Sequence, residues 1–138
     1  MKILVLSDIH ANIWALRKIL ETEQNVDKIC FAGDMVDYGI APAEVIEWFK
    51  THSDTIAVKG NHDAYAVKLF YQKDFKNIPS KKYKWIHYNL EKLSEKQIDF
   101  LNCLPKFQYF LSDGWAYLIT HQYVENTYDT IENQTQYK

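Results

Sequence analysis

The chain has 138 residues, of which 47% are apolar and 15% aromatic. This composition excludes an intrinsically disordered protein and fits one compact domain. Sixteen basic residues stand against 18 acidic residues, which gives a net charge of −2. Because sequence-independent nucleic-acid binding needs a positive field, no strong nucleic-acid binding is expected.

The sequence contains no pattern typical of a membrane protein or a secreted, disulfide-linked protein. The first apolar run covers only residues 3–6, which is too short for a signal peptide or a membrane span. Cys30 and Cys103 form neither a C-x-x-C motif nor a disulfide framework. We therefore expect a cytoplasmic protein that does not associate with membranes.

Three apolar runs are each followed by residues with helical spacing. The first run is continuous instead of alternating, which predicts a strand buried on both faces, and Asn12 is placed to cap the helix after it. Such successive units predict an α/β fold with a parallel βαβαβ sheet, flanking helices and right-handed crossovers. The strand and helix pairs cover residues 2–6 with 12–24, 29–32 with 42–49, and 55–58 with 62–71.

The second half of the chain has a different pattern. An amphipathic helix is predicted over residues 83–93, and residues 94–97 form a capping-box pattern that opens another helix. Two strand candidates, residues 107–111 and 115–120, are separated by Ser-Asp-Gly. A turn sequence of this kind predicts an antiparallel hairpin.

No linker rich in Gly, Ser or Pro divides the chain. We expect one domain over residues 1–121, and a polar tail or edge segment over residues 122–138. Residues 73–84 carry five lysines and one aspartate. We interpret them as a solvated loop, with attraction of a phosphorylated substrate as the alternative.

Polar side chains able to bind a metal ion follow each predicted strand of the parallel sheet. Because the carboxyl ends of parallel strands open at one edge, these side chains should meet there. Carboxylate and imidazole ligands suit Mn, Fe, Zn or Ni, whereas an all-oxygen cage would favour Mg or Ca. A structural zinc knot is excluded, since none of the candidate ligands is a cysteine thiolate. The candidates are Asp8, His10, Asp34, Asp37, Asn61, His62, Asp63 and His121.

Each of these patterns, taken alone, also has a purely structural interpretation. Asp8 and Asp34 can be capping carboxylates in strand-end turns, and Gly60 and Asn61 both tolerate positive φ in a turn. His121 can be a polar strand terminus. The presence of three patterns in order, each at a strand end, favours one shared site.

The segments Asp8-Ile9-His10, Gly33-Asp34-Met35-Val36-Asp37 and Gly60-Asn61-His62-Asp63 resemble the first three motifs of the calcineurin-like metallophosphoesterases. The likeness is closest to the small bacterial and archaeal phosphodiesterases of that superfamily, and it covers nearly the whole chain. It implies the metallophosphoesterase sandwich of two sheets and two divalent metal ions, with manganese favoured.

The resemblance also implies which residues would hold these ions. Asp8 and His10 would hold one metal ion, and Asp34 would bridge to the second. Asn61 and His121 would hold that second ion. Two cations about 4 Å apart can share a bridging hydroxide as the nucleophile and stabilise the charge of an in-line displacement.

Two further residues take catalytic roles by the same resemblance. His62 would donate a proton to the leaving oxygen, and Asp37 would orient the His62 ring through a hydrogen bond. Protein phosphatases of the superfamily have Asp-Arg-Gly after the second motif, where this chain has Tyr38-Gly39. A protein phosphatase is therefore disfavoured against a phosphodiesterase or a small phosphoester hydrolase.

The chain also departs from the family pattern near its C-terminus. No histidine follows His121, so the Gly-His-x-His motif that closes the family's site is missing, and Gln122 stands where the family usually has Gly. Each metal would keep three protein ligands instead of four, which predicts weaker metal binding or completion by another chain. The second sheet should be incomplete, which predicts a homo-oligomer or low stability.

Two functions from different classes follow. The first is a metal-dependent phosphoesterase that hydrolyses a phosphodiester or small phosphoester through a metal-bridging hydroxide. The alternative is a truncated, catalytically weak domain of the same kind that acts as a binding or interaction module.

Overall fold

The computed structural model describes residues 1–122, with the backbone alone at positions 73 and 74. The expected polar tail therefore lies outside the described residues, apart from Gln122. Among the helices described, none has the length and apolar character needed to cross a bilayer.

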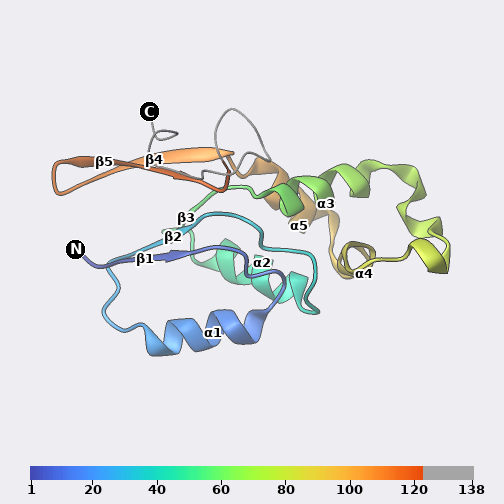
Figure 1. Ribbon diagram of the computed structural model, residues 1–138, viewed down its shortest axis with the longest axis horizontal. Helices are drawn as coiled ribbons and strands as arrows, with labels where there is room; N and C mark the ends of the chain where they lie inside the picture. The colour runs from blue at the N-terminus through green and yellow to red at the C-terminus, as the bar shows by residue number, and fades with distance from the viewer. Residues whose placement is uncertain (123–138) are drawn as a thin grey trace, which may run out of the picture.

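The first half of the chain is a parallel sheet that alternates with helices, as the sequence predicts (Figure 1). The strand order is β1-β2-β3, and Leu6 pairs with Phe31, which pairs with Ala57. The three strands therefore end level, and the loops after them start from one edge. The elements are β1 (Ile3–Leu6), α1 (Ile13–Thr22), β2 (Lys28–Phe31), α2 (Pro42–Thr51), β3 (Ile56–Ala57) and α3 (Asn61–Tyr71).

The second half adds two short 3-10 turns, two helices and a hairpin. Tyr83, expected inside a helix, instead precedes it, because the chain is still extended at Tyr83 and Lys84. The predicted hairpin is confirmed, and it lies on the opposite side of the sheet from α1 and α2 (Figure 1). The elements are η1 (Lys73–Asn77), η2 (Ser80–Lys82), α4 (Trp85–Lys92), α5 (Glu95–Cys103), β4 (Phe107–Ser112) and β5 (Trp115–Thr120).

Local signals in the sequence set the helix starts. The Asn12 side chain accepts a hydrogen bond of 3.0 Å from the Ala15 amide and so caps α1. Pro42 occupies the first turn of α2, where its missing N–H costs nothing. The Gln97 side chain accepts from the Ser94 amide at 2.9 Å, which completes the capping box that opens α5.

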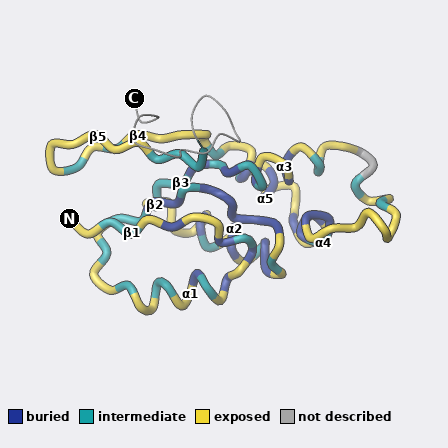
Figure 2. The backbone as a smooth tube through the Cα atoms, in the orientation of Figure 1, coloured by how far each residue is buried: buried dark blue, intermediate teal, exposed yellow. Residues whose placement is uncertain are grey.

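The hydrophobic core lies between the parallel sheet and the helices, and Figure 2 shows the buried segments concentrated there. Leu16, Phe31, Ile46 and Leu101 are fully buried and join α1, β2, α2 and α5. The prediction that the first strand is buried on both faces is wrong, because Val5 is 60% exposed. The helices cover one face of β1, and the described residues leave its other face largely open.

The hairpin packs less closely than the rest of the described chain. Asp113 and Gly114 both have positive φ, which suits a two-residue turn between paired antiparallel strands. Leu111 is 81% exposed and Trp115 is 71% exposed. The described residues thus form a second sheet of only two strands, as expected, and exposed residues make up most of it (Figure 2). Several of its exposed side chains are apolar.

Candidate metal centre

The loops after β1 and β2 are joined backbone to backbone at the carboxyl edge of the sheet. The Asp8 amide donates to the Gly33 carbonyl at 3.0 Å, and the His10 amide donates to the Asp34 carbonyl at 3.1 Å. Asp8, His10 and Asp34 all have positive φ, a conformation that is costly for residues with a Cβ. The fold therefore holds these side chains in fixed directions.

Asp34 lies at the centre of the site. Its Oδ1 accepts a hydrogen bond of 2.9 Å from the His62 amide, and its Oδ2 lies 3.3 Å from His121 Nε2 and 3.9 Å from His10 Nε2. Burial raises the pKa of Asp34, but hydrogen bonds and charge from His121 and His62 outweigh burial and lower that pKa below its usual value. The side chain is therefore an anion surrounded by imidazoles.

Two groups of three side chains meet at this carboxylate. One group joins Asp34 to His10 and His62, and the other joins Asp34 to Asp8 and His121. Within each group the candidate ligand atoms all lie within 4.8 Å of one another. Two adjacent groups that share one carboxylate form the arrangement that a pair of bridged divalent ions requires.

The ring orientation of two histidines fits metal binding. His10 Nδ1 lies 2.8 Å from the Val36 carbonyl oxygen, and His121 Nδ1 lies 2.7 Å from the Ala32 carbonyl oxygen. Because a carbonyl only accepts, each Nδ1 carries a proton, and in the neutral ring Nε2 keeps the lone pair that can bind a metal. In both residues Nε2 lies on the side of Asp34.

Asn61 adds a neutral oxygen to the second group. Its Oδ1 lies 2.9 Å from His121 Nε2, so both residues face the same point as Asp34. The hydrogen bond and charge of Asp34 raise the pKa of His121 to about 9, against the opposing effect of burial. At neutral pH the His121 imidazolium therefore places positive charge between two oxygens.

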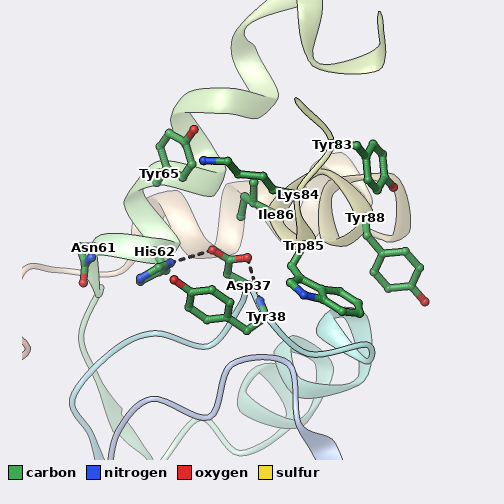
Figure 3. Close-up of a pocket in the computed structure, with 10 residues that line it drawn as sticks. All are labelled: Asp37, Tyr38, Asn61, His62, Tyr65, Tyr83, Lys84, Trp85, Ile86 and Tyr88. Atoms are coloured by element: carbon green, nitrogen blue, oxygen red, sulfur yellow. Dashed lines mark hydrogen bonds and ion pairs between the residues drawn. The ribbon is translucent and has the colours of Figure 1, made fainter. Parts of the chain in front are cut away.

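His62 and Asp37 form a pair beside this centre. His62 Nδ1 lies 2.8 Å from the Asp37 carboxylate (Figure 3). Asp37 is itself held in place, because its amide donates to the Asn89 side chain at 3.0 Å and its other carboxylate oxygen accepts from the Tyr38 amide at 2.8 Å. The Tyr38 ring packs against the His62 ring with 5.1 Å between centroids. The direction of the imidazole is therefore fixed.

Asp63 is a buried carboxylate for which the sequence indicates no specific role. Its oxygens accept backbone hydrogen bonds from Gly60 at 3.0 Å, Asp34 at 2.9 Å, Met35 at 2.8 Å and Val36 at 3.3 Å. Burial raises the pKa of Asp63, and the amide hydrogen bonds oppose that effect. Asp63 thus ties the loop after β2 to the start of α3.

The structure brings all seven predicted site residues together. Asp8, His10, Asp34, Asn61 and His121 surround one region, and His62 and Asp37 lie at its border. Sequence reasoning missed the hydrogen bonds made by Asn89, whose position on α4 carries no motif. It also listed Asp63 only as a possible ligand, although that carboxylate instead accepts from the backbone.

Comparisons with known proteins agree with this geometry. The computed fold resembles the crystal structure of a metallophosphoesterase from Sphaerobacter thermophilus, with a TM-score of 0.68 and 30% identity over 84% of this chain and 45% of that chain. An uncharacterized protein of Methanocaldococcus jannaschii is 41% identical over 63 residues, which are 44% of this chain and 26% of that protein.

A symmetrical bis(5'-nucleosyl)-tetraphosphatase of Coxiella burnetii is 34% identical over 56 residues, or 41% of this chain and 19% of that enzyme. The chain therefore matches less than two thirds of the length of each of these relatives. A family model described as calcineurin-like phosphoesterase matches residues 1–137. The chain belongs to the calcineurin-like phosphoesterase family.

Proposed function

We propose that this chain is a metal-dependent phosphoesterase that hydrolyses a phosphodiester or another small phosphoester. The observation that carries the proposal is the sharing of Asp34 between two groups of candidate ligands. A single buried carboxylate between two imidazole-containing groups has the chemistry of a bridging ligand. Family membership and the donor types support the same conclusion.

In this proposal the side chains divide into two ligand sets. Asp8, His10 and Asp34 would hold one divalent ion, and Asp34, Asn61 and His121 would hold the other. Asp8 also lies near His121, but its contact of 3.6 Å with His10 Nε2 assigns it to the first ion. The mixed oxygen and nitrogen donors favour manganese, with iron, zinc and nickel as the other candidates. When bound, such ions activate water and neutralise charge on the phosphoryl oxygens.

His62 and Asp37 act on the other side of the reaction. During hydrolysis the bond between phosphorus and the leaving oxygen breaks, and the leaving oxygen must gain a proton. His62 supplies that proton, while the 2.8 Å contact with Asp37 orients the ring. His62 also has a ring nitrogen near the candidate ligand atoms of His10 and Asp34. The pairing of its Nδ1 with Asp37 is what favours proton donation over metal binding.

The substrate class is a small phosphoester. Tyr38 and Gly39 occupy the position where protein phosphatases of the superfamily carry a phosphate-gripping arginine and a glycine. The Coxiella relative is named as a bis(5'-nucleosyl)-tetraphosphatase, and such a small named substrate supports a small substrate here over a phosphoprotein.

The test is hydrolysis of bis(4-nitrophenyl) phosphate with and without Mn²⁺. We expect Mn-dependent activity in the wild type, and losses of at least about 100-fold in Asp34→Asn and His62→Ala. His52→Ala is the matched control, because His52 lies at the exposed end of α2. Activity that survives both site substitutions would contradict the proposal.

The second candidate is a catalytically weak binding module. The described residues favour it in one respect, because they supply only three protein ligands to each proposed ion. Metal content of protein purified without chelator separates the two functions. Two ions per chain support the enzyme, whereas a chain that holds no metal and hydrolyses nothing supports the module.

A further inference from the structure

A cleft of about 790 Å³ opens beside His62 (Figure 3). Its volume lies within the range of about 300–1,000 Å³ that is typical of small-molecule sites. The loop after β2, the start of α3 and the chain leading into α4 form its walls. Half of the ten described lining residues are aromatic: Tyr38, Tyr65, Tyr83, Trp85 and Tyr88.

These aromatic side chains are largely outside the protein core. Tyr38 is 56% exposed, Trp85 is 52% exposed and Tyr65 is 45% exposed. Among the described lining residues Ile86 alone is aliphatic, so the cleft offers flat π surfaces and phenolic hydroxyls instead of a slot for an acyl chain. This lining suits a planar ring with polar edges.

Charge at the cleft suits an anionic ligand. Lys84 lines it, and its amine extends across the cleft toward Tyr65 of α3 (Figure 3). The Asp37 carboxylate is engaged by His62 and by the Tyr38 amide. A ligand that combines a planar ring with a phosphate would match both features, because an ammonium group binds phosphate oxygens.

A buried side chain links the aromatic side of the cleft to the loop that carries Asp37. The buried Asn89 side chain accepts from the Asp37 amide at 3.0 Å, and it donates to the carbonyls of Gly39 at 2.9 Å and Trp85 at 3.1 Å. Because one side chain spans α4 and the loop that carries Asp37, the backbone at Trp85 is tied to the loop that holds the partner of His62. The cleft is therefore formed before any ligand enters, which lowers the cost of binding.

We infer that this cleft is a nucleotide subsite, in which the base stacks on Trp85 and neighbouring tyrosines while the phosphate meets Lys84. The inference rests on the proposed function in one respect, because that function requires the phosphate of the bound nucleotide to point toward Asp34. Since His62 borders the cleft and protonates the leaving oxygen in that function, the base belongs to the leaving group. The substrates are then phosphoesters whose leaving group carries a nucleoside.

Two ligands that differ only in the base test this subsite. AMP and ribose 5-phosphate share the sugar and the phosphate, and calorimetric titration in EDTA measures their binding without any metal or turnover. We expect AMP to bind about 5- to 150-fold more tightly in the wild type, the range that base stacking on an aromatic side chain supplies. Trp85→Ala should reduce the ratio of the two affinities to about one.

Two further variants control for folding and for the number of tryptophans. Trp85→Phe keeps a stacking surface and should retain most of the preference for AMP. Trp115→Ala removes another exposed tryptophan, which lies on β5 and does not line the cleft, and should leave the preference unchanged. Equal affinities for the two ligands in the wild type, or an unchanged ratio in Trp85→Ala, would overturn the inference.

The outcome is distinguishable from failure of the proposed function. A Trp85-dependent preference for AMP in a chain that hydrolyses no phosphoester would support the subsite and refute the enzyme. Mn-dependent hydrolysis without any preference for AMP would support the enzyme and refute the subsite.

Discussion

The Asp63 carboxylate accepts a hydrogen bond of 2.9 Å from the backbone amide of Asp34. Three other amides, those of Gly60, Met35 and Val36, donate to the same carboxylate. The position of the central Asp34 therefore depends on a side chain that belongs to neither ligand group. Asp63 is a positioning residue in this arrangement.

We predict that Asp63→Asn weakens Mn²⁺ binding and lowers the free energy of unfolding by about 1–3 kcal/mol, because an amide nitrogen would then face backbone N–H donors. Calorimetric titration with Mn²⁺ and urea unfolding measure the two effects. Asp54→Asn, at an exposed turn, is the control and should change neither. An Asp63→Asn protein that binds Mn²⁺ as tightly as the wild type would refute the positioning role.

Gly60 and Gly114 are required for different reasons, and this leads to a second prediction. A Cβ at Gly60 would collide with the Asp34 carboxylate and backbone nitrogen, whereas a Cβ at Gly114 would meet open space. Gly60→Ala should therefore reduce both stability and Mn²⁺ affinity. Gly114 has a φ of +79°, so Gly114→Ala should cost about 1 kcal/mol of stability and leave Mn²⁺ affinity intact. Equal effects of the two substitutions on Mn²⁺ binding would contradict this distinction.

The sequence predicts the parallel sheet and the edge where the site lies, because those features depend on local signals. Continuous apolar runs and the cap at Asn12 act over a few residues, and parallel strands necessarily open at one edge. The burial of Val5 was predicted wrongly for the opposite reason. Whether the second face of β1 is covered depends on distant segments of the chain, and the local pattern of β1 carries no information about them.

The polar contacts that support the site also lie beyond local patterns. Asn89 is 52 residues from Asp37 in the chain, and only the packing of α4 places its side-chain amide against the loop that carries Asp37. The packing of α4 also brings Trp85 to the same cleft as Tyr38. In the sequence, Tyr83 and Ile86 read as one stripe of a helix, since the spacing of apolar residues cannot show that Tyr83 precedes the helix.

His62 and Asp37 make a third prediction, which concerns the leaving group. If His62 protonates the leaving oxygen, its removal should matter most for a basic leaving group. We expect His62→Ala to slow hydrolysis of a phenyl phosphoester by about 10,000-fold, and that of the corresponding nitrophenyl ester by about 100-fold. Asp37→Asn should show the same selectivity with a smaller loss, because the ring remains but is less well oriented.

Metal content is the control for this comparison, since His62 also borders the group formed by His10 and Asp34. Both variants should retain the manganese content of the wild type. Equal losses for the two esters, or loss of the metal together with the activity, would assign His62 to metal binding instead of proton transfer.

His121 makes a fourth prediction, which concerns pH. Asp34 raises the pKa of the His121 imidazole to about 9 in the folded chain, above its ordinary value of 6.5. In the metal-free protein, the stabilisation from this imidazolium is complete below pH 6.5 and is lost as the pH rises through 9. Metal binding needs the neutral ring, so Mn²⁺ must displace the proton at neutral pH.

Between pH 7 and 8.5 we therefore expect the apparent Mn²⁺ affinity of the site that contains His121 to rise about tenfold per pH unit, with close to one proton released from His121 when that site is filled. Calorimetric titration in two buffers of different ionisation enthalpy counts the protons. Above pH 9 this release should fall toward zero, and His121→Ala should abolish it at every pH. Proton release that is the same at pH 7.5 and pH 9.5 would show that His121 does not compete with the metal, because a ring already neutral at the higher pH has no proton to give.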